Sequence, residues 1–331
     1  MAANHDPGCS VQYWTEGPWQ GSLRHAAVPE AGPGQVLVET LHSGISRGTE
    51  TLVHRGAVPG AVTDIMRAPY QLGELPFPVS HGYLNVGVVQ DPGGPLDGLT
   101  VFSLAGHRQH VVLDTADAHI VPEGMPAERA LLAGAAETGL NALWESQLSI
   151  GDRVAVIGAG MIGISTALLA SRMPLQRLEV IDVDPQRREF IAALGLTAVA
   201  PESASQDNDV VVHCSAQSDG LALALSSTGD DGVIIELSWY GTDSPQVPLG
   251  QDFHARRLRI LASQVGEVAL PRRARRTRAE RLRQALHMLD ERFDPLITGR
   301  SPLSRLPAVI DGMSQGAEQY RGSICHVIDH R

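Results

Sequence analysis

Three glycines that follow a short apolar run have the clearest potential for chemistry. Gly158, Gly160 and Gly163 stand between the apolar residues 154–157 and a run of small and apolar residues that predicts a helix. The first glycine permits a tight turn, the second leaves room for a pyrophosphate, and the third lets the helix pack closely on the preceding strand. Free N–H groups at the helix start then face the anion. The spacing predicts a dinucleotide-binding turn, although an ordinary strand–helix turn without a ligand shares it.

A carboxylate at the end of the next apolar run supports this prediction. Asp182 lies 19 residues after Gly163, where a carboxylate binds a ribose diol and repels a 2′-phosphate. We therefore expect NAD, while Arg187, five residues further on, leaves NADP open. The residues expected to contact the cofactor here are Gly158, Ala159, Gly160, Met161, Ile162, Gly163, Asp182, Val183 and Arg187.

The surrounding elements are of the kind that would position such a turn. In the second half of the chain, predicted strands alternate with plausible helices, which is typical of a doubly wound parallel sheet. The first half reads as several strands and turns, followed by a helical pattern over residues 126–145. A long Gly- and Pro-rich segment at 53–78 is predicted to be a lid over a site. The predicted strands of the second half are 153–157, 178–183, 209–213, 232–237 and 258–262.

The composition limits the class of protein. With 331 residues, 43% of them hydrophobic and 19% charged, the chain can form two domains of a soluble globular protein. The net charge of −11 argues against nucleic-acid and anionic-membrane surfaces. All 26 basic residues are arginine, so a lysine Schiff base is excluded. We expect the arginine cluster at 272–283 to be a solvated helix face.

Several features indicate a cytoplasmic protein. The three cysteines, Cys9, Cys214 and Cys325, match no metal-ligand spacing, and we expect them to be reduced. No secretory signal is recognisable at the start, and no apolar run reaches the length that spans a bilayer.

Four motifs give the chain a family resemblance. They begin at Ser43 (Ser-Gly-Ile-Ser-Arg), Pro78 (Pro-Val-Ser-His-Gly-Tyr-Leu-Asn-Val-Gly-Val-Val), Glu137 (Glu-Thr-Gly-Leu-Asn-Ala-Leu) and Gly151 (Gly-Asp-Arg-Val-Ala-Val-Ile-Gly-Ala-Gly). Together they resemble the medium-chain dehydrogenase/reductase family, which includes zinc alcohol dehydrogenases. Within it, Ser-Gly-Ile-Ser-Arg-Gly-Thr-Glu and His-Gly-Tyr look most like the bacteriochlorophyllide dehydrogenase branch.

The resemblance implies an α/β architecture with two domains. We expect a GroES-like, β-rich catalytic domain over residues 1–140 and a Rossmann-type NAD-binding domain with a doubly wound parallel sheet over 141–266. Residues 267–331 are expected to return to the catalytic domain. Relatives often pair through the edge of the cofactor-domain sheet, which implies a homodimer.

The departures from the family pattern concern zinc. The three places where zinc members carry ligands hold Ser46, Tyr83 and Gly134, and no cysteine lies in 88–110, where the four-cysteine lobe would be. Serine, tyrosine and glycine do not form the tetrahedral nitrogen and sulfur site that zinc prefers. The sequence therefore predicts a member without a metal.

Without zinc, a side chain or bound water must handle the hydroxyl proton during hydride transfer. Tyr83 is the first candidate, because a phenol donates to a carbonyl and relays a proton; the alternative is a buried structural tyrosine. Glu137 is the second, as a base with a raised pKa or as a structural carboxylate capping a helix. Glu50 and Ser46 are weaker candidates: Glu50 fits a helix start better than a catalytic role, and Ser46 either hydrogen-bonds to substrate or only fills the vacated ligand site.

The resemblance also implies further cofactor contacts. Arg47 is expected to reach the pyrophosphate, Thr138 to touch the nicotinamide, and the strand ends with Ser238, Trp239 and Gln264 to line its carboxamide side.

The expected function is that of an NAD-dependent, zinc-independent dehydrogenase or ketoreductase. It would interconvert a secondary alcohol and a ketone on a small or ring-bearing metabolite. The alternatives are an NAD(P)H-dependent enoyl or quinone reductase and a catalytically silent dinucleotide-binding protein.

Overall fold

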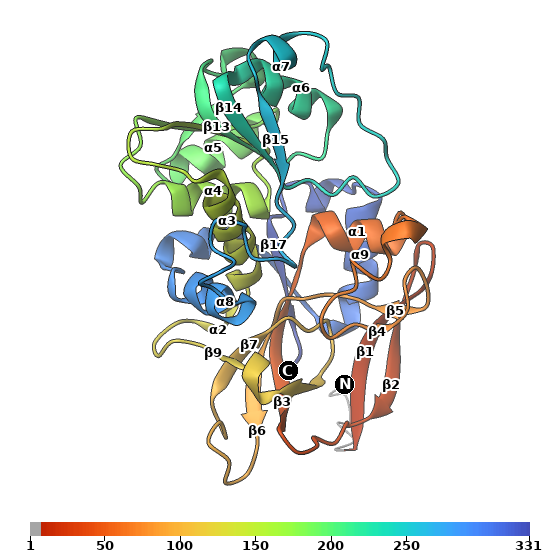
Figure 1. The fold of residues 1–331 in the computed structure, drawn as a ribbon. Coiled ribbons are helices and arrows are strands. Elements are labelled where there is room, and N and C mark those ends of the chain that lie inside the picture. The colour runs from red at the N-terminus through yellow and green to blue at the C-terminus, as the bar shows by residue number, and fades with distance from the viewer. Residues whose placement is uncertain (1–7) are drawn as a thin grey trace. The chain divides into compact units, whose positions relative to one another are not determined.

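The computed structural model describes residues 8–331, which form two compact units (Figure 1). Unit 1 runs up to Gly134 and resumes at Pro295, and unit 2 is the segment Ala135–Asp294. The chain therefore leaves unit 1, builds unit 2 and returns. The chain returns at Pro295 and not at residue 267, where we expected it, and the helix over 278–287 is held in unit 2 by the buried side chain of Arg281.

Unit 2 contains a parallel sheet with the strand order β12-β11-β10-β13-β14-β15. Strand β10 pairs with β11 on one side and with β13 on the other, so successive strands are added on one side of β10 first and then on its other side. In such sheets, ligands bind outside the carboxyl ends of the strands at this change of side. The predicted doubly wound sheet is confirmed.

The elements of unit 2 follow the predicted alternation closely. Strand β10 is buried apart from its first residue, as expected of a central parallel strand covered on both faces. Helix α5 begins at Asp184, whose side chain accepts the N–H of Gln186, and α8 begins with a capping box between Thr277 and Glu280. The elements are α3 (Ala133–Ser146, which starts in unit 1), β10 (Arg153–Ile157), α4 (Met161–Ala170), β11 (Arg177–Ile181), α5 (Pro185–Ala193), β12 (Thr197–Val199), β13 (Asn208–His213), α6 (Ser218–Ser227), β14 (Thr228–Glu236), α7 (Asp252–Ala255), β15 (Arg259–Ala262) and α8 (Arg278–His287).

Unit 1 is rich in β-structure, as predicted. One sheet has the order β2-β1-β5-β4, and the other has the order β16-β17-β3-β6-β7-β9, with β8 also paired to β3. The elements are β1 (Cys9–Gly17), β2 (Gln20–Ala27), β3 (Gln35–Ile45), α1 (Arg47–Arg55), β4 (Leu72–Gly73), β5 (Val79–Ser80), β6 (Asn85–Gln90), β7 (Thr100–Ser103), β8 (His110–Asp114), β9 (His119–Ile120), α2 (Ala127–Ala130), β16 (Ile297–Pro302), α9 (Leu306–Ser314) and β17 (Cys325–Asp329).

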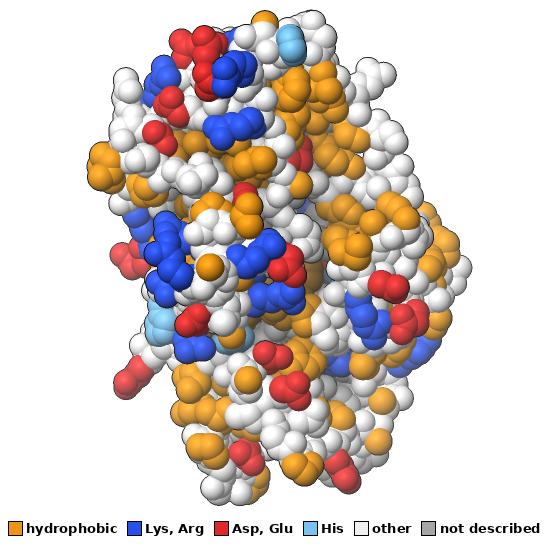
Figure 2. Space-filling view, in the orientation of Figure 1, with side chains coloured by type: hydrophobic (Ala, Val, Ile, Leu, Met, Phe, Trp, Pro, Cys, Tyr) orange, Lys and Arg blue, Asp and Glu red, His pale blue; other side chains and the backbone are white. Residues whose placement is uncertain are grey.

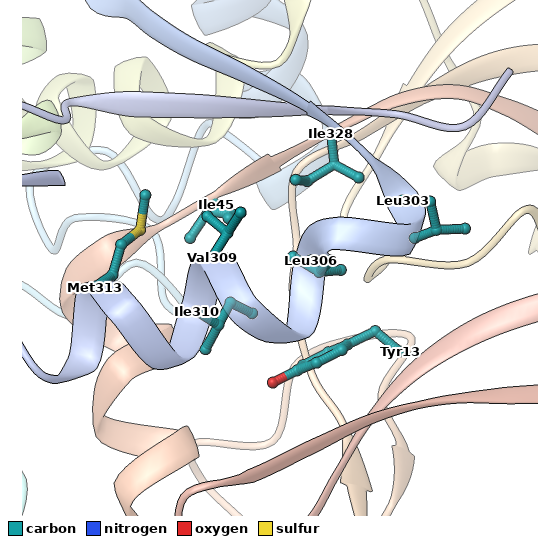
Figure 3. Packing of buried hydrophobic residues seen from close by; sticks show 8 residues of the cluster. All are labelled: Tyr13, Ile45, Leu303, Leu306, Val309, Ile310, Met313 and Ile328. Carbon is teal, nitrogen blue, oxygen red and sulfur yellow. The ribbon is translucent and has the colours of Figure 1, made fainter. Parts of the chain in front are cut away.

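A hydrophobic cluster joins the first and last parts of unit 1. Helix α9 places Leu306, Val309, Ile310 and Met313 against residues from β1, β3 and β17 (Figure 3). Because these partners come from both ends of the sequence, burial of this cluster holds the two parts of unit 1 together. The strand partners are Tyr13, Ile45 and Ile328.

Two stretches of the chain are interrupted. Residues 78–90 form two separate strands, β5 and β6, because Gly82 between them has φ +130° and passes within contact distance of Gly106. The helix expected over 126–145 is divided into α2 and α3. The segment 53–78, predicted to be a lid, contains the end of α1, a 3₁₀ turn at Gly60–Val62 and the short strand β4, and its role as a lid stays a prediction.

The surface shows no continuous basic patch on the visible face. Arginine and acidic side chains are interspersed there (Figure 2), which fits the net charge of −11. Among the helices of residues 8–331, none is long and apolar enough to span a membrane.

The cluster around α9 provides a stability prediction. Ile310→Ala should lower the free energy of unfolding by about 2–5 kcal/mol, because Ile310 is 1% exposed and its removal leaves a cavity. Ile65→Ala is the matched control, since Ile65 is 73% exposed. Urea unfolding followed by circular dichroism measures both, and equal effects of the two substitutions would contradict the role given to the cluster.

Candidate functional site

The glycine turn lies at the carboxyl end of the central strand β10. Gly158 has φ +98°, and a Cβ there would lie 2.8 Å from the backbone nitrogen of Ser215. A Cβ on Gly163 would lie 2.0 Å from the carbonyl oxygen of Gly158, so this glycine permits α4 to pack on the turn. Gly160 is exposed, and a Cβ there would meet nothing within 4 Å. The turn is therefore tight at its first and third glycines and open at its second, as pyrophosphate binding requires.

Asp182 braces the same turn. Its Oδ2 accepts the N–H of Ala159 at 2.8 Å, and its Oδ1 accepts the N–H of Asp184 at 2.9 Å. An ionised carboxylate has about four lone-pair positions, so two remain for a ribose diol. Beside it, the side chain of Val183 is 79% exposed, and Arg188 donates to the carbonyl oxygens of Asp182 and Val183.

The other residues predicted to contact this part of a cofactor lie nearby in the chain. Met161 and Ile162 form the first turn of α4, and Arg187 lies in the first turn of α5. The roles of these residues stay predictions.

A polar cluster at the ends of β13 and β14 was missed by sequence reasoning. His213 and Glu236 are paired in register, and the Nδ1 of His213 lies 2.8 Å from the Oε2 of Glu236. The Nε2 of His213 lies 2.6 Å from the hydroxyl of Ser215, which directly adjoins the glycine turn. Polar residues ending two neighbouring buried strands are the signal that would have revealed the cluster.

Ser238 belongs to the same cluster. Its N–H donates to Oε1 of Glu236 at 2.7 Å, and its hydroxyl accepts the N–H of Ala216 at 3.0 Å. Burial opposes the ionisation of Glu236, but the hydrogen bonds from His213 and Ser238 outweigh it and lower the pKa of this carboxyl. An anionic, hydrogen-bonded group therefore lies beside the glycine turn.

Of the remaining predicted cofactor contacts in unit 2, Trp239 is half-buried after β14. The carbonyl oxygen of the Gln264 side chain accepts the N–H of Gly266 at 2.6 Å, and Thr138 is half-buried on α3.

Glu137 is held in a buried ion pair. Its Oε1 lies 3.0 Å from Arg281, whose guanidinium also donates to Asn141 and to the carbonyl oxygens of Val265 and Glu267. Burial raises the pKa of Glu137 to about 7, and Arg281 offsets only part of this effect. The expectation that the arginine cluster is a solvated face is wrong for Arg281, which is 1% exposed because it satisfies the buried carboxylate.

In unit 1, Tyr83 and Ser46 form a short hydrogen bond. The two hydroxyl oxygens lie 2.5 Å apart, and the Tyr83 hydroxyl also lies 3.2 Å from that of Thr49. Burial raises the pKa of Tyr83 above its ordinary value of 10, and the bonds to Ser46 and Thr49 offset part of this rise. Tyr83 is therefore a neutral phenol near pH 7, and as the more acidic hydroxyl it donates to Ser46. The proton of Ser46 has no acceptor among the described residues.

Glu50 lies behind Ser46. Its Oε1 accepts the N–H of Ser46 at 2.7 Å, and its Oε2 lies 2.7 Å from Nε2 of His107. Glu50 thus has the helix-start role at α1 that the sequence allowed. Arg47, the first residue of α1, donates to the carbonyl oxygen of Arg321 at 3.3 Å, and its contact with a pyrophosphate stays a prediction.

The three positions that resemble zinc-ligand positions do not fit zinc. The side chains of Ser46 and Tyr83 are hydrogen-bonded to each other. A Cβ on Gly134 would lie 2.6 Å from the side chain of Leu84, so the apolar side chain of Leu84 occupies the space beside Gly134. Over residues 8–331, no three His, Cys, Asp or Glu side chains are arranged to hold a metal ion. All three cysteines are free thiols.

The raised pKa of Glu137 predicts how stability depends on pH. Because the folded-state value of about 7 exceeds the ordinary value of 4.5, the stability that protonation provides is complete below pH 4.5 and is lost as the pH rises through 7. Glu137→Gln removes this titration. The stability of the wild type relative to the variant should therefore fall by up to about 3 kcal/mol over that range.

Urea unfolding at pH 5 and pH 8 measures this difference, with Glu145→Gln on the same helix as the control. The variant leaves Arg281 without its anion at both pH values. This constant cost cancels when the difference in stability between wild type and variant at pH 5 is compared with the difference at pH 8. A difference that is the same at both pH values would contradict the prediction.

Comparison with known proteins identifies similar chains. No family model matches the sequence. The uncharacterised zinc-type alcohol dehydrogenase-like protein YphC of Escherichia coli is 25% identical over 166 residues, which are 46% of this chain and 47% of YphC. The match thus spans about half the length of that relative.

Two solved structures illustrate the similarity of fold. The putative zinc-binding dehydrogenase of Sinorhizobium meliloti, bound to NADP, has a TM-score of 0.76 and 18% identity over 97% of this chain and 99% of its own. Acetophenone reductase of Geotrichum candidum, in complex with NAD, has a TM-score of 0.75 and 18% identity over 98% of both chains. The homologues and structural neighbours of the chain are therefore zinc-type alcohol dehydrogenase-like proteins of the medium-chain dehydrogenase/reductase family, and the chain has their fold.

Proposed function

We propose that the chain is an NAD(H)-dependent, zinc-independent oxidoreductase that interconverts a secondary alcohol and a ketone. The observation that carries this proposal is the hydrogen bond between Tyr83 and Ser46, two hydroxyls standing where the resembled zinc enzymes hold ligands. It leaves the Ser46 proton available to a substrate oxygen while Tyr83 stands behind it as the proton source.

The proton chemistry follows from this arrangement. A nicotinamide cofactor, when bound, supplies the hydride for reduction and accepts it in oxidation. As negative charge develops on the carbonyl oxygen, the Ser46 hydroxyl gives its proton to that oxygen and a new O–H bond forms. Tyr83 passes its own proton to Ser46, and the phenolate regains one from solvent. In alcohol oxidation each proton moves in the opposite direction.

The glycine turn and Asp182 support the cofactor assignment. The turn has open space at Gly160, and the carboxylate of Asp182 lies against it. A negative charge at that place disfavours a 2′-phosphate, so we propose NAD over NADP. The related structures contain one example of each cofactor, so they do not decide between the two.

The substrate proposal is a small or ring-bearing secondary alcohol. The neighbouring acetophenone reductase is named for a ketone with an aromatic ring, which agrees with this class. A homodimer, a cytoplasmic location and the place of the chain in the bacteriochlorophyllide dehydrogenase branch remain parts of the proposal.

Gly160→Ala tests the cofactor site. The backbone at Gly160 has φ −82°, which any residue adopts, and an added Cβ meets no protein atom, so folding stability should change by less than about 1 kcal/mol. The methyl group would occupy the space for the pyrophosphate, so the Kd for NADH should rise at least about tenfold, a loss of about 1.4 kcal/mol. Calorimetric titration measures the Kd, with Gly250→Ala, also in open space, as the control. Unchanged NADH affinity would place the pyrophosphate elsewhere.

Tyr83→Phe tests the proposed reaction. Removing the phenolic hydroxyl should lower kcat about a hundredfold, the usual contribution of a general acid, and leave NADH binding unchanged. The assay measures ketone reduction and alcohol oxidation over a panel of substrates with NADH or NADPH, after treatment with a chelator. Tyr320→Phe, whose hydroxyl forms no described hydrogen bond, is the control.

Three results would contradict the proposal in different ways. A strong preference for NADPH would reject the cofactor, and loss of activity on chelation with recovery on adding zinc would reject zinc independence. NADH binding without turnover of any substrate would favour a silent binding protein.

A further inference from the structure

A chain of buried polar side chains continues inward from Glu50 within unit 1. Oε2 of Glu50 lies 2.7 Å from Nε2 of His107, and Nδ1 of His107 lies 2.6 Å from the hydroxyl of Ser43. The same hydroxyl lies 2.8 Å from Nε2 of His330. All four side chains are buried, with none more than 6% exposed.

With both imidazole rings neutral, each hydrogen bond of the chain has one consistent direction. A carboxylate only accepts, so the proton between Glu50 and His107 belongs to Nε2 of His107. With a neutral ring, the Nδ1 of His107 then accepts from the Ser43 hydroxyl. The Ser43 oxygen in turn accepts from Nε2 of His330. The bonds therefore run in one direction, from His330 to Glu50, and each group has a single consistent role.

Such a chain of buried polar groups indicates a role beyond packing. Burial of several polar groups costs folding free energy, and their mutual hydrogen bonds recover that cost without adding to it. An apolar core in the same place would be simpler. The chain brings together three separate segments: the end of β3 with the start of α1, the loop between β7 and β8, and the residue after β17. It ends at Glu50, whose other oxygen holds the N–H of Ser46.

We propose that His107, Ser43 and His330 are positioning residues that fix Ser46 against Tyr83 through Glu50. This inference rests on the proposed function, in which Ser46 and Tyr83 move the proton. The Ser43 hydroxyl holds Nδ1 of His107 and so fixes the orientation of the ring whose Nε2 faces Glu50. Glu50 can then hold the backbone of Ser46 where its hydroxyl meets the phenol at 2.5 Å.

The role predicts a loss of rate without a loss of binding. Small errors in the placement of a reacting group lower the rate strongly, because they reduce the population of productive geometry. In Ser43→Ala, Nδ1 of His107 has no donor, so the ring is held only by Glu50 and its orientation is less fixed. We expect kcat to fall about tenfold, with KM for the substrate and the Kd for NADH unchanged.

Ser10→Ala is the matched control for Ser43→Ala. Ser10 is also fully buried, and its hydroxyl has no hydrogen-bond partner among the described residues, so its loss should leave kcat unchanged. Equal kcat values for Ser43→Ala, Ser10→Ala and the wild type would overturn the proposal. So would a change in KM alone.

Two substitutions of His107 separate positioning from simple packing. In His107→Gln, the amide N–H can donate to Glu50 and the amide oxygen can accept from Ser43, so the direction of the chain is kept. His107→Ala breaks it. We expect the glutamine variant to retain kcat within about threefold of the wild type and the alanine variant to lose about tenfold or more. Equal losses in kcat for both variants would mean that only the imidazole volume matters, and would overturn the proposal.

Nuclear magnetic resonance tests the network without any turnover. In the full-length protein labelled with ¹⁵N, spectra of His107→Gln and His330→Gln assign the two rings by difference. Both should carry their proton on Nε2, and Ser43→Ala should shift the Nδ1 resonance of His107, which loses its hydrogen-bond donor. A proton on Nδ1 of His107 in the wild type would overturn the network, whatever the activity. Absence of turnover in a wild type with the expected tautomers would instead reject the proposed function.

Discussion

A carboxylate that is removed from water must have its oxygens occupied by donors, and Glu50 shows how much of unit 1 follows from this constraint. One oxygen holds the N–H of Ser46 and the other faces His107. The first contact starts helix α1, and the second ties that helix to the loop between β7 and β8. The hydroxyl of Ser46 that meets Tyr83 is therefore placed by a buried carboxylate.

The same rule operates in unit 2 at two places. Glu137 is satisfied by Arg281, which fixes α8 to α3, and Glu236 is satisfied by His213 and Ser238 at the ends of neighbouring strands. The first pair is enclosed, whereas the second adjoins the glycine turn. The buried carboxylates at these three sites are thus all paired, and a role of Glu137 as a base stays a prediction.

Local spacing made part of this organisation predictable. The glycine turn, Asp182 and the strands of the parallel sheet depend on residues close in sequence, and the structure has these elements where the pattern indicated them. Tyr83 and Ser46 were selected by the family resemblance, because the family's motifs indicate that positions distant in the sequence belong to one site. His107 and His330 could not be found, because they meet Ser43 only through the fold and no local pattern marks them. The prediction of a solvated side chain was wrong for Arg281, because nothing in the run of arginines distinguishes the one whose side chain is buried.

The discontinuity of unit 1 has a consequence for the order in which the protein folds during synthesis. Unit 2 is one continuous segment, so all its strands are available before the last part of the chain emerges. Strand β3, however, can pair with β17 only after the whole of unit 2 has been made. If unit 2 folds as it is made, this edge of β3 is still unpaired at that stage and is exposed to pairing with other chains until β17 arrives.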